Sequence, residues 1–92
     1  MRQLVRFFYA LKDPVRLRIL IALARAGEMT VTEIVETVHL AQPLISWHLA
    51  RLRAAHLVRV TRDGRLARYA LDMDALERHW ADFLSMLQEP SR

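Results

Sequence analysis

The apolar positions near the start of the chain follow the three- and four-residue spacing of helices. Positions 4, 7, 8 and 11 are Leu, Phe, Phe and Leu, which predicts a short helix over residues 2–11. Asp13 and Pro14 predict the start of a second helix, because Asp caps a first turn and Pro fits the first helical position. Gly27 marks the end of that helix near Ala26.

The next two helices are predicted to be joined by a short turn. Thr30 and Glu33 have the spacing of a capping box, which predicts a third helix that ends at Val38. The turn His39-Leu40-Ala41 separates it from a fourth helix with Pro43 in its first turn. The apolar positions 45, 49 and 52 of this helix form one stripe, so we expect them to be buried.

The pattern changes from helical to alternating at about residue 58. Val58 to Thr61 and Leu66 to Leu71 flank Asp63-Gly64, a dipeptide typical of a tight β-hairpin turn. Helical spacing returns at positions 76, 80, 83, 84 and 87, which predicts a last helix over residues 73–88. Aspartates at 72 and 74 suit the positive N-terminal end of that helix.

The predicted fold is mainly α with a two-stranded β-hairpin wing: four helices, two strands and a last helix. This is the plan of a winged helix-turn-helix, in which the second helix of a closely joined pair lies in the major groove of DNA. Residues 1–92 form one small domain, and an apolar fraction of 53% allows a packed core.

Four stretches of the chain resemble the ArsR/SmtB family of bacterial winged-helix repressors. They are LKDPVRLRIL (11–20), TVTEIVETV (30–38), QPLISWHLARLRAAHLV (42–58) and VTRDGRLARYAL (60–71), in the order and at the spacing of the family. The resemblance implies a dimeric, DNA-binding transcriptional repressor that pairs through its first and last helices. It also implies release of the operator when a metal ion or another chemical signal binds.

The positive charge is concentrated in the middle of the chain. Residues 42–71 contain six arginines and one aspartate, a sum of +5. Residues 72–92 contain two arginines and five acids, a sum of −3. This asymmetry favours a polyanion bound on one face, with a merely solvated charged surface as the alternative.

The side of the fourth helix that faces away from its buried stripe is expected to contact DNA. Gln42 can bond the edge of an adenine through both groups of its amide, and Ser46 can contact a base or a phosphate. Arg62 and Arg65 bracket the hairpin turn, where contacts to the DNA backbone or the minor groove are expected. The predicted DNA contacts are Gln42, Pro43, Ser46, Trp47, His48, Arg51, Arg53, Arg62, Arg65 and Arg68.

Four of these residues have a second interpretation, and one of them is Arg68, which can contact a phosphate or a partner within the protein. His48 corresponds to the histidine of the family's Ser-x-His-Leu pattern, at the DNA side or its rim, but a hydrogen-bonded histidine within the helix fits nearly as well. Trp47 stands where the family more often has a polar or basic residue, and it can lie against sugars and thymine methyl groups or pack on the wing. Arg51 can reach a phosphate or extend over the core.

Helix ends differ from the usual pattern of the family at three positions. His39 and His56 stand where the family commonly has glycine, and a left-handed backbone is expected at such positions. Ala41 stands where a capping Ser is usual, a loss of roughly 0.5–2 kcal/mol.

The first and last helices have more apolar surface than terminal helices of a small domain can hide within one subunit. We therefore predict a homodimer that pairs through helices 2–11 and 73–88, with covering of each subunit's own core as the alternative. Two-fold symmetry then predicts a double-stranded DNA operator with inverted half-sites. The predicted interface residues are Leu4, Phe7, Phe8, Leu76, Trp80, Phe83, Leu84 and Leu87.

The absence of cysteine excludes disulfides and thiolate metal sites, and it fits a cytoplasmic protein. One type of family member binds metal through Asp-x-His and His-x-x-His/Glu on the last helix. The corresponding candidates here match that spacing only in part, so no metal and no cofactor is predicted. A repressor that senses metal through them is kept as an alternative; they are Asp72, Asp74, His79 and Asp82.

Other classes of function fit the sequence less well. Ser46 and His48 lie two apart on one helix and point in different directions, so they cannot form a nucleophile–base pair, and no enzyme is predicted. The longest apolar run, residues 19–24, is too short to span a membrane, and no signal peptide is evident. The remaining alternative is a winged-helix module that binds an acidic protein partner.

Overall fold

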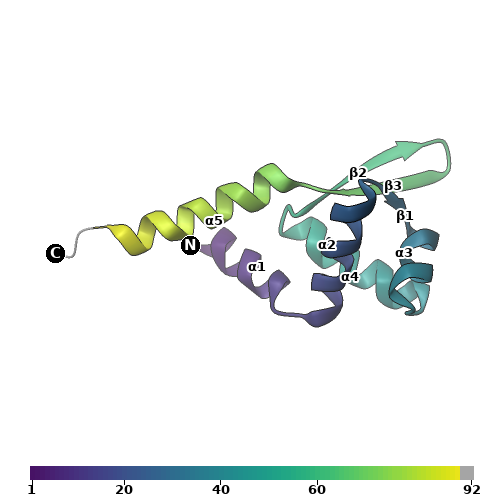
Figure 1. Ribbon diagram of the computed structural model, residues 1–92, viewed down its shortest axis with the longest axis horizontal. Helices are drawn as coiled ribbons and strands as arrows, with labels where there is room; N and C mark the ends of the chain where they lie inside the picture. The colour runs from purple at the N-terminus through teal and green to yellow at the C-terminus, as the bar shows by residue number, and fades with distance from the viewer. Residues whose placement is uncertain (90–92) are drawn as a thin grey trace.

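The computed structural model describes residues 1–89, so residues 90–92 of the predicted domain lie outside it. It measures 52 Å along its longest axis against 23 and 21 Å across, because the last helix extends away from the rest of the chain (Figure 1). The elements are α1 (Arg2–Leu11), α2 (Pro14–Ala26), β1 (Met29–Thr30), α3 (Val31–Val38), α4 (Gln42–Ala54), β2 (Val58–Asp63), β3 (Leu66–Leu71) and α5 (Met73–Gln88).

The helix ends follow the local signals in the sequence. Asp13 caps α2, its carboxylate accepting from the backbone N–H groups of Val15 at 2.8 Å and Arg16 at 3.1 Å. The capping box of Thr30 and Glu33 is formed in both directions. These contacts confirm the predicted starts of α2 and α3, since both depend only on residues within one turn.

Both predicted left-handed positions are confirmed. His39 ends α3 with φ 62°, and His56 follows α4 with φ 60°. At the start of α4, Ala41 provides no side-chain cap, as its methyl group requires. In the turn between α3 and α4, α3 therefore ends at a histidine with a strained backbone, and α4 begins without a side-chain acceptor for its first turn.

The sheet contains one strand more than the predicted hairpin. Its order is β1-β3-β2, antiparallel throughout, and the β2–β3 hairpin has Val60 opposite Tyr69. The added strand is Met29–Thr30, which pairs with Tyr69 and Arg68 of β3. Two residues are too few to show an alternating pattern, so this strand is defined by its partner and not by its own sequence.

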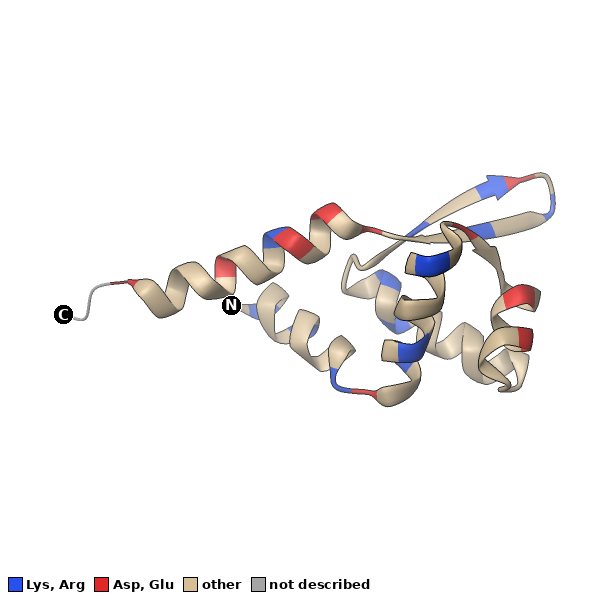
Figure 2. Cartoon of the chain, in the orientation of Figure 1, with Lys and Arg blue, Asp and Glu red and all other residues tan. Residues whose placement is uncertain are grey.

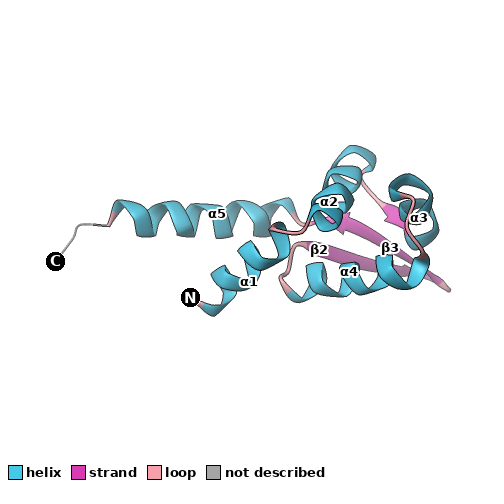
Figure 3. Ribbon diagram, turned by 90° about the horizontal axis from the view of Figure 1, so that it is seen from below, coloured by secondary structure: helices cyan, strands magenta, loops and turns pink. Residues whose placement is uncertain are grey.

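The core lies between the helices and the inner side of the sheet, and α4 runs along the strands (Figure 3). The stripe Ile45, Leu49 and Leu52 is fully buried, as predicted. It meets Ile19 and Leu23 of α2 and further apolar side chains of α1 and α3 in one cluster. This packing fixes which side of α4 faces solvent.

Two residues of the predicted dimer interface lie in the core of the chain itself. Leu4 and Phe7 are buried in the core of the chain, and the ring of Phe7 also meets His79 of α5, with 5.0 Å between the ring centroids. Phe8 is next to Phe7 and is only partly buried; it packs against α5, with its ring centroid 4.8 Å from that of Phe83 and 6.4 Å from that of Trp80. The apolar positions of α1 thus contribute both to the core and to the contact with α5, and sequence spacing alone could not separate these two roles.

Among residues 1–89, no helix combines the length and the apolar character that a membrane span requires.

Candidate nucleic-acid interface

The outward side of α4 exposes most of the residues that the sequence predicted to contact DNA. Gln42, Pro43 and Ser46 lie on its first two turns and are exposed. Further along the helix, Trp47, Arg51 and Arg53 are also exposed. The exposed side chains of the helix therefore include amide, hydroxyl, aromatic and guanidinium groups, while its stripe Ile45, Leu49 and Leu52 is held in the core.

His48 does not belong to this surface. Its side chain is only 4% exposed, and Nδ1 lies 3.3 Å from Nη1 of Arg16, itself 3% exposed. The structure thus corrects its place among the predicted DNA contacts and agrees with the second interpretation, a hydrogen-bonded histidine within the helix. The physical reason is that position 48 lies beside the buried stripe, facing the start of α2.

Arg16 joins three helices and was not singled out by the sequence pattern. Its Nε donates to the carbonyl of Ala10 at 2.9 Å and its Nη2 to the carbonyl of Tyr9 at 3.2 Å, both in the last turn of α1. The third contact is His48 on α4. Arginines are rarely buried unless their donors are satisfied, so the sequence pattern did not predict a buried arginine here. The position of Arg16, shortly after the helix start at Asp13-Pro14, was the one sequence feature that could have pointed to it.

Burial, hydrogen bonds and neighbouring charges shift the pKa values of His48 and Asp13 in this network. Burial lowers the pKa of His48, because the charged imidazole would lose its hydration; Asp13 opposes this shift and Arg16 adds to it. For Asp13, burial raises the pKa, but the two backbone N–H groups that it caps and the charges of Arg16 and His48 together outweigh burial, so the net pKa is lowered. Burial thus favours the neutral form of His48, whose Nδ1 can accept from the guanidinium of Arg16.

Trp47 is exposed but held in place on one side. The guanidinium carbon of Arg51 lies 5.0 Å from the centre of its ring, and that of Arg16 lies 5.9 Å away. The imidazole of His48 meets the ring edge-on at 5.0 Å. These neighbours all lie on α2 and α4, so of its two interpretations the structure does not favour packing on the wing.

The wing carries three predicted arginines in two different settings. Arg62 and Arg65 are exposed at the end of the hairpin, which extends beyond the helices (Figure 1). Arg68 is half-buried in the central strand, opposite Thr61 and Thr30. The end of the wing is therefore free to reach a ligand, whereas Arg68 lies nearer to the body of the domain.

The charges are unevenly distributed over the elements. Basic residues lie on the hairpin, α4, α2 and α1, whereas acidic residues predominate on α5 and α3 (Figure 2). Glu33 on α3 accepts the backbone N–H of Thr30 at 2.8 Å within the capping box, and this bond lowers the pKa of Glu33. The basic groups of α4 and the wing thus lie apart from the acidic last helix.

The candidate metal ligands of α5 do not come together. Asp72 accepts the backbone N–H of Ala75 at 3.1 Å as the cap of the helix, and His79 lies against the ring of Phe7 at 5.0 Å. His79 and Asp82 line a hollow of about 300 Å³ together with His56. Within residues 1–89 of one subunit, no group of three His, Cys, Asp or Glu side chains is placed to hold a metal ion.

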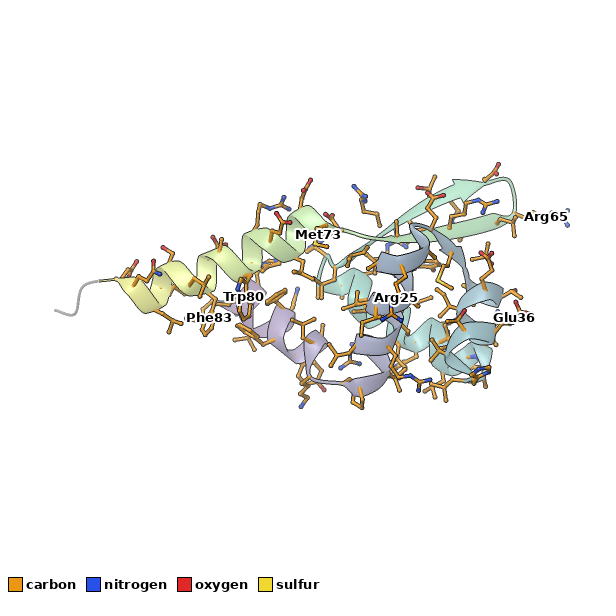
Figure 4. All side chains as sticks on the ribbon, in the orientation of Figure 1. Arg25, Glu36, Arg65, Met73, Trp80 and Phe83 are labelled. Atoms are coloured by element: carbon orange, nitrogen blue, oxygen red, sulfur yellow. The ribbon has the colours of Figure 1, made fainter. Side chains whose placement is uncertain are left out.

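The far half of α5 presents apolar side chains to solvent. Trp80, Leu84 and Leu87 are exposed, the last of them by 65%, whereas Leu76 and Phe83 are partly buried against the core. Figure 4 shows Trp80 and Phe83 where α5 passes α1. Beyond this contact α5 has no neighbour within the described chain (Figure 1).

Comparison with known proteins gives a consistent result. The family model "Bacterial regulatory protein, arsR family" matches residues 13–60. The arsenic resistance transcriptional regulator ArsR1 of Pseudomonas putida is 37% identical over 75 residues, which cover 82% of this chain and 57% of that protein. The transcriptional repressor SdpR of Bacillus subtilis is 36% identical over 76% of this chain and 77% of its own length.

Solved structures agree with the sequence matches. An ArsR-like transcriptional regulator from Rhodococcus sp. RHA1 superposes with a TM-score of 0.85 at 27% identity, covering 92% of this chain and 79% of that one. The chain spans little more than half the length of several curated relatives that it matches.

Proposed function

The chain belongs to the ArsR family of bacterial regulatory proteins, and from this premise we propose that it is a sequence-specific, DNA-binding repressor of transcription without enzymatic activity. The relatives described above are named as transcriptional regulators or repressors. The proposed ligand is double-stranded DNA, with α4 in the major groove and the end of the β2–β3 wing against the backbone or the minor groove.

The observation that carries this proposal is the outward surface of α4. Its buried stripe and the Arg16–His48 contact orient the helix from within. Gln42 and Ser46 then face outward near its N-terminus, where helices of this motif contact base edges. The first turn also lacks a side-chain cap at Ala41. Pro43 has no N–H and the N–H of Leu44 donates to the carbonyl of Ala41 at 3.1 Å, so the backbone N–H of Gln42 is the donor that a DNA phosphate would accept from.

Four exposed arginines have a proposed role in this complex. Arg51 and Arg53 on α4, and Arg62 and Arg65 on the wing, contact phosphates or groove edges. Arg68 is a less direct contributor, because it is half-buried in the sheet. These contacts position the protein, whereas the polar groups of α4 select the sequence.

We further propose that residues 1–92 form one domain that dimerises through α1 and α5. The support is the apolar surface that Trp80, Leu84 and Leu87 leave exposed in the described chain, 48%, 39% and 65% of each residue. Burying one such side chain in a partner contributes roughly 1.5–3 kcal/mol. Two-fold symmetry then brings two copies of α4 to inverted half-sites of one operator.

The proposal is tested by binding of the protein to duplex DNA over a series of salt concentrations. We expect tight binding to the DNA upstream of its own gene, weaker binding to random duplex, and a loss of affinity for both as salt rises. The slope is about 0.9 per phosphate contact on a double-logarithmic plot. Absence of binding even at low salt would contradict the proposal and favour an acidic protein partner.

The same assay addresses the effector. A panel of divalent metal ions is added to the complex with operator DNA. Release by one ion would support sensing through Asp72, Asp74, His79 and Asp82 of paired subunits, whereas unchanged binding would exclude those ions as effectors.

A further inference from the structure

Two large apolar side chains lie exposed on the DNA-facing part of α4. Leu44 is 43% exposed and Trp47 is 49% exposed. They are three residues apart, so they are neighbours on the helix surface. We refer to these two residues as the apolar pair. Nothing in the proposed contacts to phosphates and polar base edges uses them.

Of the apolar pair, Trp47 is held in a defined position. Arg51 lies over the ring of Trp47, 5.0 Å from its centre, and the buried imidazole of His48 meets the ring from the side. A side chain that is already fixed loses little conformational entropy when it binds a ligand. Trp47 is thus pre-organised on the solvent side of α4.

The surroundings of the apolar pair decide what it binds. Arg51 and Arg53 lie on the same helix, Arg62 and Arg65 lie on the wing, and residues 42–71 sum to a charge of +5. A ligand that meets this surface is a polyanion that also presents small apolar groups. In the major groove of DNA, such a group is the methyl at C5 of thymine, and 5-methylcytosine presents the same group.

We propose that Leu44 and Trp47 read pyrimidine C5-methyl groups, so that each half-site contains a thymine whose methyl packs against the apolar pair. This inference rests on the proposed DNA-binding function. It adds a specificity determinant of a different kind from Gln42 and Ser46, because it recognises a base by apolar contact and not by hydrogen bonds.

The test replaces the methyl group and nothing else. A preferred duplex is first selected from a random library, and it is then synthesised with thymine or with deoxyuridine at each thymine position. Deoxyuridine keeps every hydrogen-bonding group and lacks only the methyl. We expect deoxyuridine at the position read by the apolar pair to weaken binding about 3- to 10-fold per half-site, from roughly one buried methyl. Two further duplexes have cytosine or 5-methylcytosine at that position. Tighter binding of the 5-methylcytosine duplex than of the cytosine duplex would show that the methyl group is read without thymine.

Variants locate the effect on the protein. Leu44→Ala and Trp47→Ala are expected to bind thymine and deoxyuridine DNA with nearly equal affinity. Leu44→Ala tests the proposal independently of the contacts that Trp47 makes within the protein. Ile21→Ala, an exposed aliphatic residue of α2, is the matched control and keeps the full preference for thymine.

The outcomes separate the two proposals. Equal affinity of the unaltered protein for thymine and deoxyuridine DNA overturns the inference and leaves the proposed function standing. A preference for thymine that survives in both Leu44→Ala and Trp47→Ala also overturns it, since the methyl would then be read elsewhere. Failure to bind any duplex at low salt contradicts the proposed function itself.

Discussion

Arg16 and His48 meet inside the protein, with 3.3 Å between Nη1 of the guanidinium and Nδ1 of the imidazole, although 32 residues separate them in the chain. An arginine can only donate, so Nδ1 accepts and the proton of the neutral imidazole is on Nε2. The same guanidinium bonds two carbonyls at the end of α1. One side chain therefore fixes the orientation of α4 relative to α1 and α2.

Loss of this arginine is predicted to destabilise the fold. Arg16→Met keeps much of the aliphatic volume but leaves the carbonyls of Tyr9 and Ala10 and the Nδ1 atom of His48 without their donor. We expect the free energy of unfolding to fall by about 1–3 kcal/mol in urea denaturation. Arg25→Met, on the exposed side of the same helix, is the control and should stay within about 0.5 kcal/mol of the parent. Equal effects of the two changes would contradict a bracing role for Arg16.

The stability of the protein is predicted to decline in mild acid because of His48. Its pKa is lowered by burial, so below its ordinary value of 6.5 the unfolded chain binds a proton that the folded protein does not yet bind. The stability that the protein gains from keeping His48 neutral is therefore fully present above pH 6.5, and it is lost as the pH falls below this value. Urea denaturation between pH 8 and pH 5 measures this loss. His48→Gln is expected to show a smaller decline; a curve of unchanged slope would mean that other groups cause it.

Gln42 and Arg65 are predicted to differ in what their removal does to DNA binding. Gln42→Ala is expected to relax the preference at one base position by ~1–3 kcal/mol, because it removes a contact to a base edge. Competition among duplexes that differ at single positions measures this change. If all duplexes lose affinity equally, Gln42 does not read sequence.

Arg65→Ala provides the contrast at the end of the wing. Its loss is expected to weaken binding to all sequences alike and to reduce the salt slope by about one contact per subunit. A change of sequence preference in this variant would instead assign Arg65 to base recognition in the minor groove.

Charge placed on the far half of α5 is predicted to dissociate the dimer. Leu84→Glu and Leu87→Glu together put two carboxylates where we propose that the partner packs, while both positions are exposed in the single chain. Sedimentation should then show monomers at concentrations where the parent is dimeric, with the helix content unchanged by circular dichroism. Ile21→Glu controls for added surface charge. A double variant that stays dimeric would place the interface elsewhere.

Glycine at position 39 is predicted to stabilise the protein. His39 has φ 62°, a left-handed conformation that costs residues with a Cβ roughly 1–2 kcal/mol. Part of this gain is offset by the greater freedom of glycine in the unfolded chain, so His39→Gly should raise the free energy of unfolding by roughly 0.5–1 kcal/mol. His39→Ala separates the backbone effect from loss of the imidazole, because it keeps the Cβ and should bring no gain.

Features that depend only on neighbouring residues could be predicted from the sequence. The cap at Asp13 and the capping box at Thr30 each follow from groups within one turn, and the structure has both. The left-handed backbone at His39 and His56 was instead expected from the glycines that the family commonly has there, and the structure has it as well. The buried stripe of α4 was also predictable, because helical spacing alone puts positions 45, 49 and 52 on one side. Such signals are local, so no knowledge of the other helices is needed.

The neighbour that each side chain contacts depends on how the helices and strands pack, which the sequence pattern does not show. His48 is next to the buried stripe, and only the packing of α2 against α4 turns it inward to Arg16. The spacing of Leu4 and Phe7 along α1 would also suit a dimer interface, yet both side chains are buried in the core of the chain. The strand Met29–Thr30 exists because β3 lies beside it. In each case the contact joins residues far apart in the chain. A periodic pattern predicts that a side chain is buried, but it does not predict which other residue buries it.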